Sequence, residues 1–408
     1  MEICSITFLF PIILLGTLYP FLPSLIWRQL ALGAVNVICI SLLLPTWSSA
    51  AVFFFFILSG YGVGVTLRKH PNRSILVGYI SLFVAAFVYL KHYSFLQLVF
   101  PAGMLHSSLV IVGLSYMLFR QIHFLIDQYQ GSDDPLDLWG YLNYQINIFS
   151  LVSGPITRYP DFREDWDRLE PLWLSRYDLL MAYGRIWIGV IKVMVLGAIF
   201  YHYYSFAAPL WTPGAPTAAK FHAIRIVYLF YFFPIYIYFN FSGYCDIVIG
   251  CGYLYGLRIP ENFKTPFLSR NMIEFWSRWH ITLGVWIKDY LYTPMLRAVL
   301  TRFPKRGGNL AFLCYFIAFF IAGVWHGSTW NFVVYGLLQG LGVSVAKLWE
   351  MLLTRWLGRE GHKRYLASRP VHWAAVGLNF HYFCFTCLIF GLSFSGLRQL
   401  GLTLGLHW

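Results

Sequence analysis

The chain has 408 residues, of which 58% are hydrophobic and only 12% are charged, and its mean hydropathy is +0.61. A soluble domain carries roughly twice that share of charged residues, so the composition excludes the ordinary soluble classes. The formal charge of +13 does not indicate a nucleic-acid partner, because Lys and Arg gather in the cytoplasmic loops of membrane proteins.

Apolar runs of about 17–25 residues recur along the chain, and a helix of that length spans a bilayer. They lack two-residue alternation, so we expect α-helices and not the strands of a barrel. The expected fold is an all-α polytopic membrane protein, one domain over residues 1–408, with about eleven transmembrane helices and additional amphipathic or re-entrant helices. The spans are expected near residues 5–22, 30–44, 49–67, 75–100, 104–126, 141–157, 182–206, 223–240, 309–325, 329–350 and 371–395, with 244–257 as a further short run. Residues 1–22 lack a basic n-region and a cleavage site, so we expect a retained helix there.

Polar residues interrupt the first half of the chain at three places. The run Arg68-Lys-His70 follows the third span and indicates a cytoplasmic end. Arg120, His123 and Asp127 share one helical face, which either points into the protein interior or belongs to a helix end in water. Charges of both signs crowd between residues 158 and 178, where we expect an amphipathic segment at the membrane interface.

The seven cysteines lie mostly within apolar runs. Cys384 and Cys387 form a C-x-x-C pair, but no second pair and no histidine cluster accompanies them in the sequence. We therefore interpret them as small buried residues and expect no metal site.

Two polar residues stand out before the most polar part of the second half. Asp246 lies in an apolar run, where an unpaired carboxylate would cost at least about 2.5 kcal/mol, so it needs a partner that the sequence does not name. Asn262 lies in the short loop after Pro260 and is placed to cap or orient its neighbours.

The segment 270–292 is amphipathic, and we expect one helix there. Glu274 and Arg278 are four residues apart, the spacing of a helical ion pair. A helix with Lys288 and Asp289 is too polar to cross lipid, so it lies along the membrane surface or plugs a funnel in the protein. An aromatic stripe follows the same segment: Trp276, Trp279, Trp286 and Tyr290.

Two histidines stand out, His280 before the apolar run 309–325 and His326 at its end. His280 follows the aromatic stripe and is either an interfacial histidine or part of a site. His326 closes the run between Gly323 and Gly327, whose small size lets a backbone or a substrate approach closely. A histidine in a tight turn between helices is the alternative for His326.

The basic residues predict how the chain around the two histidines crosses the membrane. Two basic loops, which we expect in the cytoplasm, lie before and after the spans 309–325 and 329–350. These spans then cross outward and back, so His326 lies towards the outer face and His280 towards the inner face. A neutral imidazole can take the proton from an attacking hydroxyl, without metal or covalent intermediate. The loops contain Arg297, Arg302, Lys305 and Arg306, and Arg355, Arg359, Lys363 and Arg364.

Several motifs are spread over most of the chain: Leu125-Ile-Asp-Gln-Tyr-Gln-Gly131, Ser153-Gly-Pro-Ile-Thr-Arg158, Asn240-Phe-Ser-Gly-Tyr-Cys-Asp246, Arg258-Ile-Pro-Glu-Asn-Phe263, Ser269-Arg-Asn-Met-Ile-Glu-Phe-Trp-Ser-Arg-Trp-His280, Lys288-Asp-Tyr-Leu-Tyr292 and Gly323-Val-Trp-His-Gly327. Together they resemble the membrane-bound O-acyltransferase family, in particular its bacterial alginate O-acetyltransferase and teichoic-acid D-alanylation branch. Leu114–Gln121 and the tail after Phe380 show no clear family pattern.

The resemblance implies a function and a set of site residues. His326 matches the catalytic histidine of the family and His280 its second essential histidine. An acyl group such as acetyl would pass from a cytoplasmic thioester to a hydroxyl of an extracytoplasmic polysaccharide or other cell-envelope polymer. The thioester would be acyl-CoA or the phosphopantetheine arm of an acidic acyl carrier protein. The transfer would be direct or pass through a periplasmic or extracellular partner protein. The implied location is the lipid bilayer of a bacterial inner membrane, with no tightly bound cofactor. The expected supporting residues are Asp246, Asn262, Glu274, Trp276, Arg278, Trp279, Lys288, Asp289 and Trp325.

Three other functions stay open at this stage. One is D-alanyl transfer from a carrier protein toward teichoic acid. The second is an acyl-donor transporter or flippase in which the histidines relay protons. The third is a non-catalytic scaffold for an exopolysaccharide secretion complex.

Overall fold

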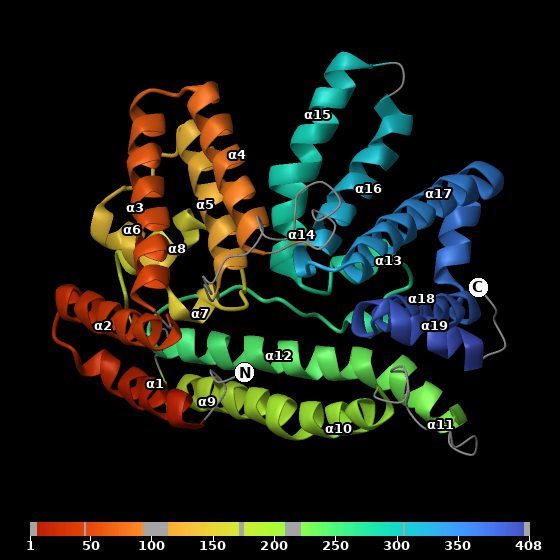
Figure 1. The fold of residues 1–408 in the computed structure, drawn as a ribbon, viewed down its shortest axis with the longest axis horizontal. Coiled ribbons are helices and arrows are strands. Elements are labelled where there is room, and N and C mark those ends of the chain that lie inside the picture. The colour runs from red at the N-terminus through yellow and green to blue at the C-terminus, as the bar shows by residue number, and fades with distance from the viewer. Residues whose placement is uncertain are drawn as a thin grey trace. The chain divides into compact units, whose positions relative to one another are not determined.

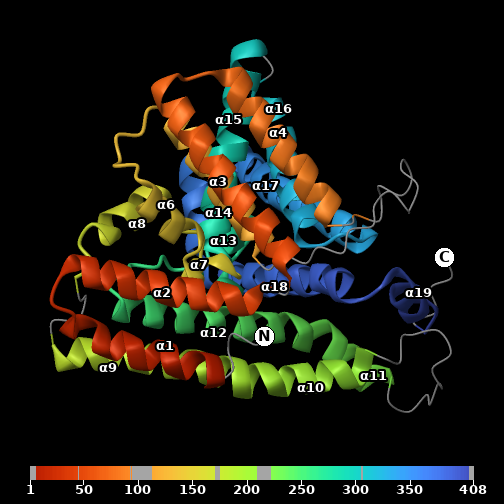
Figure 2. The same cartoon turned by 60° about the vertical axis from the view of Figure 1, so that its left-hand side comes forward.

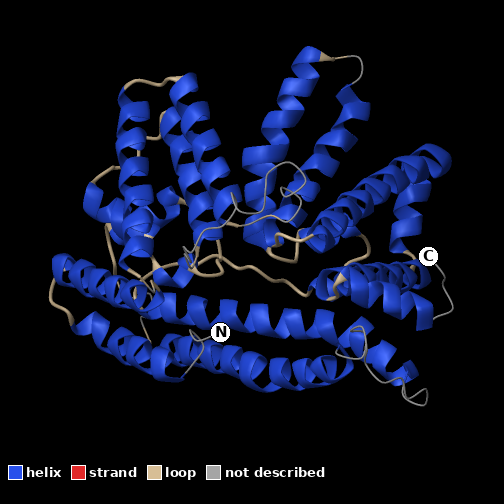
Figure 3. Cartoon of the chain, viewed as in Figure 1, coloured by secondary structure: helices blue, strands red, loops and turns tan. Residues whose placement is uncertain are grey.

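The computed structural model describes residues 6–44, 46–91, 93, 113–170, 175–208, 222–304 and 307–403. Over these ranges the chain forms helices and connecting loops and no β-strand, as Figure 3 shows. The one isolated bridge there pairs Phe263 with Trp279. The expectation of an all-α protein is confirmed.

The chain packs as two compact units. Unit 1 comprises Met1–Ile191 and Gly243–Glu261, and unit 2 comprises Lys192–Ser242 and Asn262–Trp408. The prediction of one domain over residues 1–408 stays a prediction.

Unit 1 contains the helices of the first half of the chain and the C-terminal part of one later helix, α12 (Phe233–Leu254) (Figure 1). A short 3-10 turn, η2 (Tyr19–Phe21), follows the first helix. The α-helices are α1 (Ile6–Leu18), α2 (Leu25–Leu43), α3 (Trp47–Lys69), α4 (Arg73–Leu90), α5 (Leu114–Tyr129), α6 (Leu138–Gln145), α7 (Ile148–Leu151), α8 (Tyr159–Trp166) and α9 (Arg176–Ile191).

Glycines let helices of unit 1 approach each other closely. A Cβ at Gly64 would lie 2.5 Å from the ring of Phe124, and a Cβ at Gly60 would collide with the side-chain amide of Gln121. This four-residue spacing of small residues is the pattern that allows close contact between helices in membranes. It brings α5 against α3 and α4 (Figure 1), and Figure 2 shows the connected pair α3 and α4 from another side.

Unit 2 contains the remaining elements. The chain enters it through a π-helix, η5 (Lys192–Gly197), and leaves it with α19 (Phe394–Thr403). Between them lie α10 (Ala198–Ala207), α11 (His222–Val227), η8 (Tyr228–Phe232), the N-terminal part of α12, η9 (Pro266–Leu268), α13 (Met272–Trp276), α14 (Ile281–Ile287), η10 (Lys288–Tyr292), α15 (Thr293–Arg302), α16 (Gly307–His326), α17 (Trp330–Ala367) and α18 (Arg369–Gly391).

Helices α16 and α17 form an antiparallel hairpin in unit 2. Near its closed end Gly323 faces Gly336, and further along Gly340 packs on the backbone of Phe316. These close approaches leave no room for side chains, so the glycines fix the crossing of the two helices. The hairpin determines where the residue at its turn, His326, lies.

Seven helical stretches are long and apolar enough to span a membrane, and two shorter apolar helices, Leu9–Phe21 and Leu310–His326, accompany them in the part of the chain that the structure describes. A multi-pass membrane protein is therefore confirmed, and the described residues contain fewer long spans than the eleven expected for the whole chain. The seven stretches are Leu25–Leu43, Trp47–Lys69, Arg73–Leu90, Arg176–Ala207, Ile224–Leu254, Trp330–Ala367 and Arg369–Gly391.

Three expected spans differ from the structure. The span near 141–157 is wrong: α6 and α7 are short, and the buried amides of Asn143, Gln145 and Asn147 interrupt the run. The runs 223–240 and 244–257 join into one continuous helical stretch. Residues 94–112, on which parts of two expected spans fall, lie outside the described residues, as does Cys4. The six remaining cysteines are buried free thiols.

Candidate active site

His326 is the last residue of α16 and lies at the turn of the α16–α17 hairpin. A Cβ at Gly327 would collide with the ring of Phe332, and one at Gly323 would lie 2.5 Å from the backbone nitrogen of Gly336. Of the two predicted roles for these glycines, the structure supports the close approach of protein groups. The side chain of His326 is half-buried.

Aromatic rings surround His326. The centroid of the Trp325 ring lies 4.8 Å from that of His326, and Phe390 and Tyr335 follow at 5.8 and 6.1 Å. Phe390 comes from α18 and Tyr335 from α17. These rings limit the orientations that the imidazole can adopt.

His280 lies between α13 and α14, in a left-handed backbone conformation with φ 48° and ψ 51°. The expectation of one continuous helix over 270–292 is therefore wrong. The loop segment 262–264 runs alongside the middle of this region and bonds to its backbone. The backbone N–H of Ile281 donates to the carbonyl of Asn262 at 3.0 Å, and the backbone N–H of Lys264 donates to the carbonyl of Arg278 at 2.9 Å. These bonds, together with the Phe263–Trp279 bridge, interrupt the helix.

The side chains of Asn262 and His280 are both buried, with exposed fractions of 0% and 1%. Oδ1 of Asn262 accepts hydrogen bonds from the backbone N–H of Thr282 at 3.1 Å and from its hydroxyl at 2.9 Å. Nδ1 of His280 lies 3.2 Å from the same oxygen. Asn262 thus orients His280, as the sequence predicted in general terms.

The two histidines meet around one indole ring. The ring of Trp325 lies 6.4 Å from that of His280 and 4.8 Å from that of His326, centroid to centroid. Burial lowers the pKa of His280 well below its ordinary range, and the neighbouring His326 lowers it further. His280 is therefore neutral at pH 7. The membrane face from which each histidine is reached stays a prediction.

Trp276 and Trp279 belong to the core of unit 2. Nε1 of Trp276 donates to Oε1 of Gln339 at 3.2 Å, and Nε2 of Gln339 donates to the Thr386 hydroxyl at 2.9 Å. All three polar groups are buried, so the chain of bonds joins α13 to α17 and α18. Trp279 stacks on Phe275 at 5.5 Å.

Glu274 forms the predicted ion pair with Arg278, at 2.7 Å, and a second with Arg270, at 3.0 Å. Burial opposes the charged carboxylate, but the hydrogen bonds and charge of Arg270 and the charge of Arg278 keep its pKa below the ordinary value. The amide of Asn271 also accepts from the backbone N–H of Glu274, which caps α13. Glu274 holds the start of the segment that leads to His280.

Lys288 and Asp289 are exposed at the start of η10. Trp286, one turn earlier, is buried and packs on Tyr290 at 5.6 Å. The supporting role of Lys288 and Asp289 stays a prediction.

Asp246 belongs to unit 1, where its carboxylate accepts from Nε of Arg185 at 3.2 Å. Arg185 also binds both carboxylate oxygens of Glu261, each at 2.6 Å. Gly189 of α9 packs closely on α12, since a Cβ at Gly189 would lie 2.6 Å from the carbonyl oxygen of Gly243. This contact brings Arg185 of α9 to Asp246 of α12. The predicted need of Asp246 for a partner is met there.

The polar face of α5 points into unit 1. Arg120 and His123 are 1% and 0% exposed, and Arg120 donates to the carbonyl of Tyr144 at 2.6 Å. A ring nitrogen of His123 makes a hydrogen bond with the Tyr144 hydroxyl. Asp127 is half-buried. Of the two interpretations of this face, the structure supports the interior one.

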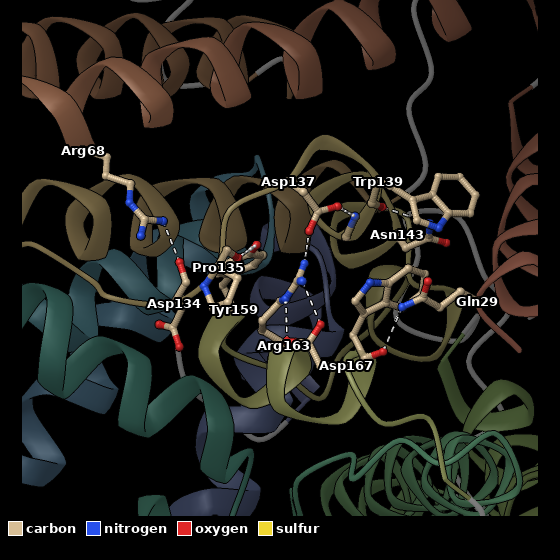
Figure 4. Close-up of polar contacts among 12 residues, drawn as sticks. Gln29, Arg68, Asp134, Pro135, Asp137, Trp139, Asn143, Tyr159, Arg163 and Asp167 are labelled. Atoms are coloured by element: carbon tan, nitrogen blue, oxygen red, sulfur yellow. Dashed lines mark hydrogen bonds and ion pairs between the residues drawn. The ribbon is translucent and has the colours of Figure 1, made fainter. Parts of the chain in front are cut away.

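The charged segment that begins at Arg158 is tied to other parts of unit 1. Arg163 lies between Asp137 and Asp167 and bonds to both, as Figure 4 shows. Trp166 is 1% exposed, so its ring packs inward and is not presented to a membrane interface. Of the residues between 158 and 178, 171–174 lie outside the described part of the chain.

Sequence reasoning missed several residues of the site. Gln339 is a lone amide in an apolar run, and such a group in a membrane helix signals a buried bond that could have been noticed. Tyr335 and Phe390 carry no such signal, because aromatic residues are common throughout this chain. Phe241, whose ring stands edge-on to His280 at 4.8 Å, is a similar case.

Comparison with known proteins supports a membrane-bound acyltransferase. The profile of the membrane-bound O-acyltransferase family, MBOAT, matches residues 74–395. Since this match covers well over half of the sequence, the chain belongs to the membrane-bound O-acyltransferase family. It is an acyltransferase that crosses the membrane several times.

Three bacterial relatives are similar to this chain. The teichoic acid D-alanyltransferase of Bacillus subtilis is 26% identical over 343 residues, covering 82% of this chain and 81% of the relative. The peptidoglycan O-acetyltransferase of Helicobacter pylori is 26% identical over 304 residues, 67% of this chain and 52% of the relative. A probable alginate O-acetylase of Pseudomonas syringae is 29% identical over 250 residues, 59% of this chain and 43% of the relative.

Proposed function

We propose that this acyltransferase moves an acyl group, acetyl or similar, from a cytoplasmic thioester to a hydroxyl of a cell-envelope polymer outside the membrane. The transfer is direct or passes through a partner protein. The names of the three relatives support a polymer acceptor, because each refers to teichoic acid, peptidoglycan or alginate. The proposed location is the inner membrane of a bacterium.

The observation that carries this proposal is the cluster of His280, Trp325 and His326 within unit 2. Two imidazoles packed around one indole, with His280 neutral, provide a base and a second polar group in an otherwise apolar setting. Asn262, Glu274 and Trp276 hold the backbone that carries His280. Asp246 forms its ion pair with Arg185 within unit 1.

In the proposed reaction the base is His326. Its neutral imidazole takes the proton of the acceptor hydroxyl as the oxygen attacks the thioester carbonyl. The C–O bond forms, the C–S bond breaks, and the proton on His326 passes to the departing sulfur, so that the products are the ester and a free thiol. His280 positions the thioester or assists the proton transfer. This reaction needs no tightly bound cofactor.

The charge of the chain supports an anionic donor that meets unit 2. Unit 2 contains eighteen of the 30 Lys and Arg residues but only four of the 17 Asp and Glu residues. Arg297 and Arg302 are exposed on α15, at the open end of the α16–α17 hairpin and away from His326, whereas Lys305 and Arg306 lie outside the described residues. The phosphates of coenzyme A and an acidic acyl carrier protein both complement such a surface.

Substitution of the base tests the proposal in cells. We expect His326→Ala to abolish acylation of the envelope polymer while the protein stays at its normal level in the membrane. His202→Ala is the matched control, because His202 is exposed on α10. Unaltered acylation in His326→Ala would refute the assignment, and unaltered acylation in both His280 and His326 variants would favour a scaffold.

Two measurements separate the other candidates. Mass analysis of the polymer shows whether the added group is acetyl or D-alanyl, and the similarity to a D-alanyltransferase over 82% of the chain makes D-alanyl transfer the second candidate. Turnover in detergent, where no sealed membrane exists, excludes a flippase as the main activity.

A further inference from the structure

Asn262 makes several hydrogen bonds around His280. Its Oδ1 receives the backbone N–H and the hydroxyl of Thr282, and it faces Nδ1 of His280. Its backbone carbonyl receives the N–H of Ile281. Asn262 therefore connects both residues that follow His280 with the imidazole, Ile281 through its backbone carbonyl and Thr282 through its carboxamide.

The partners of this carboxamide determine which of its atoms faces His280. A backbone N–H can only donate, so the atom 3.1 Å from the Thr282 nitrogen must be the oxygen and not the NH2 group. An amide oxygen can only accept. Nδ1 of His280, at 3.2 Å from that oxygen, must therefore carry a hydrogen. In a neutral imidazole the lone pair is then on Nε2.

We propose that Asn262 is a positioning residue that fixes His280 as the Nδ1-protonated tautomer and makes Nε2 the hydrogen-bond acceptor of the site. This inference rests on the proposed function, because it assigns His280 an acceptor role toward an O–H or N–H of the substrates or of His326. In this tautomer Nε2 carries no proton, so it accepts a hydrogen bond and does not donate one to the developing oxyanion.

The surroundings of His280 support an uncharged acceptor. The imidazole is 1% exposed, and the ring of Phe241 meets it edge-on at 4.8 Å. Burial in such an apolar setting disfavours an imidazolium. The second histidine, His326, further opposes a positive charge there. These groups keep Nε2 free of a proton at neutral pH.

The backbone of His280 supports a role beyond packing. A non-glycine residue with φ 48° is strained, and such conformations persist where surrounding bonds determine them. The bonds from residues 262–264 hold it, and the strain turns the imidazole toward Asn262 instead of along a continuous helix.

Two variants test the positioning role by kinetics. Asn262→Leu removes the acceptor, and we expect kcat to fall about 10–100-fold with KM changed less than about twofold, as for other residues that orient a functional histidine. Thr282→Val is the control: it removes one bond to Oδ1 but leaves the bond to His280, so kcat should stay within about threefold of the wild type. A fall in kcat as large in Thr282→Val would indicate a structural role and overturn the proposal.

Asn262→Asp supplies a readout that a structural role would not change. The carboxylate keeps the acceptor oxygen but stabilises a protonated His280, which raises the pKa of that histidine. Protonation fills Nε2, so activity should fall at low pH and recover as the pH rises through the new pKa. In the wild type the pKa of His280 is well below the ordinary range, so His280 should cause no such fall near neutral pH, and any fall there comes from protonation of the base His326. A wild-type pH profile in Asn262→Asp would overturn the proposal.

The tautomer itself can be observed in the full-length protein in lipid. Nitrogen-15 spectra of histidine-labelled wild type and His280→Gln give the His280 signals by difference, and we expect a protonated Nδ1 and an unprotonated Nε2 that change in Asn262→Leu. An Nε2-protonated His280 overturns the positioning role, even if His326→Ala is inactive as the proposed function requires. Wild-type turnover in both His280→Gln and His326→Ala overturns the proposed function instead.

Discussion

The crossing of α16 and α17 allows a direct test of how His326 is held. In Gly323→Ala the new Cβ would lie 2.5 Å from the nitrogen of Gly336 and closer still to its Cα. Ordinary carbon contacts begin near 3.4 Å, so the two helices must separate by about 1 Å at this point. The contact is with backbone, and no flexible side chain can move aside.

This separation should affect both stability and turnover. Overpacking of this kind costs about 1–3 kcal/mol. His326 lies three residues after the crossing, and a misplacement of about 1 Å at a reacting group can lower the rate by about 100-fold. We therefore expect Gly323→Ala to melt at a lower temperature in detergent and to lose about 10–100-fold in kcat.

Gly377→Ala is the matched control for this experiment. Gly377 lies within α18, also in unit 2, and a Cβ there would meet nothing within 4 Å. Since Ala is favoured over Gly in a helix by about 1 kcal/mol, this control should be as stable as the wild type or more so, with unchanged turnover. Wild-type stability and turnover in Gly323→Ala would refute the account of how the hairpin positions His326.

Three further predictions concern the polar groups around the site. Gln339→Leu leaves the indole N–H of Trp276 without its acceptor and should cost about 1 kcal/mol of unfolding free energy, measured by denaturant titration in detergent; no loss would contradict a role for this bond. Asp246→Asn and Arg185→Gln should couple by about 1 kcal/mol in a double-mutant cycle, and additive effects would show that the pair contributes nothing. Glu274 has a pKa held below its ordinary value, so its ion pairs stabilise the fold above about pH 4.3 and are lost as the pH falls through the folded pKa. Glu274→Gln should lower the melting temperature at pH 7 but flatten its decline at acid pH, and an unchanged decline would exclude this contribution.

Features that depend on neighbouring residues in the sequence could be predicted. The membrane helices follow from apolar runs, and the Glu274–Arg278 pair follows from its spacing. His280 and His326 were selected from motif resemblance and charge topology, and the structure brings both to Trp325.

Features that depend on distant parts of the chain could not be predicted. The helix expected over 270–292 is interrupted because residues 262–264 pair with its middle, and no local pattern signals that pairing. The partner of Asp246 is Arg185, 61 residues away, which the sequence places in a different apolar run. The expected span near 141–157 contains three amides that find buried partners in unit 1, so hydropathy over a window was misleading there.

The most direct test of the central claim is a transfer assay with the purified protein in detergent. A labelled acyl thioester and a soluble hydroxyl-bearing fragment of an envelope polymer are the substrates, and the labelled ester is the product measured. We predict ester formation by the wild type and by His202→Ala, and none above background by His326→Ala. Equal ester formation by His326→Ala and the wild type would contradict the assignment of acyl transfer to the two-histidine cluster.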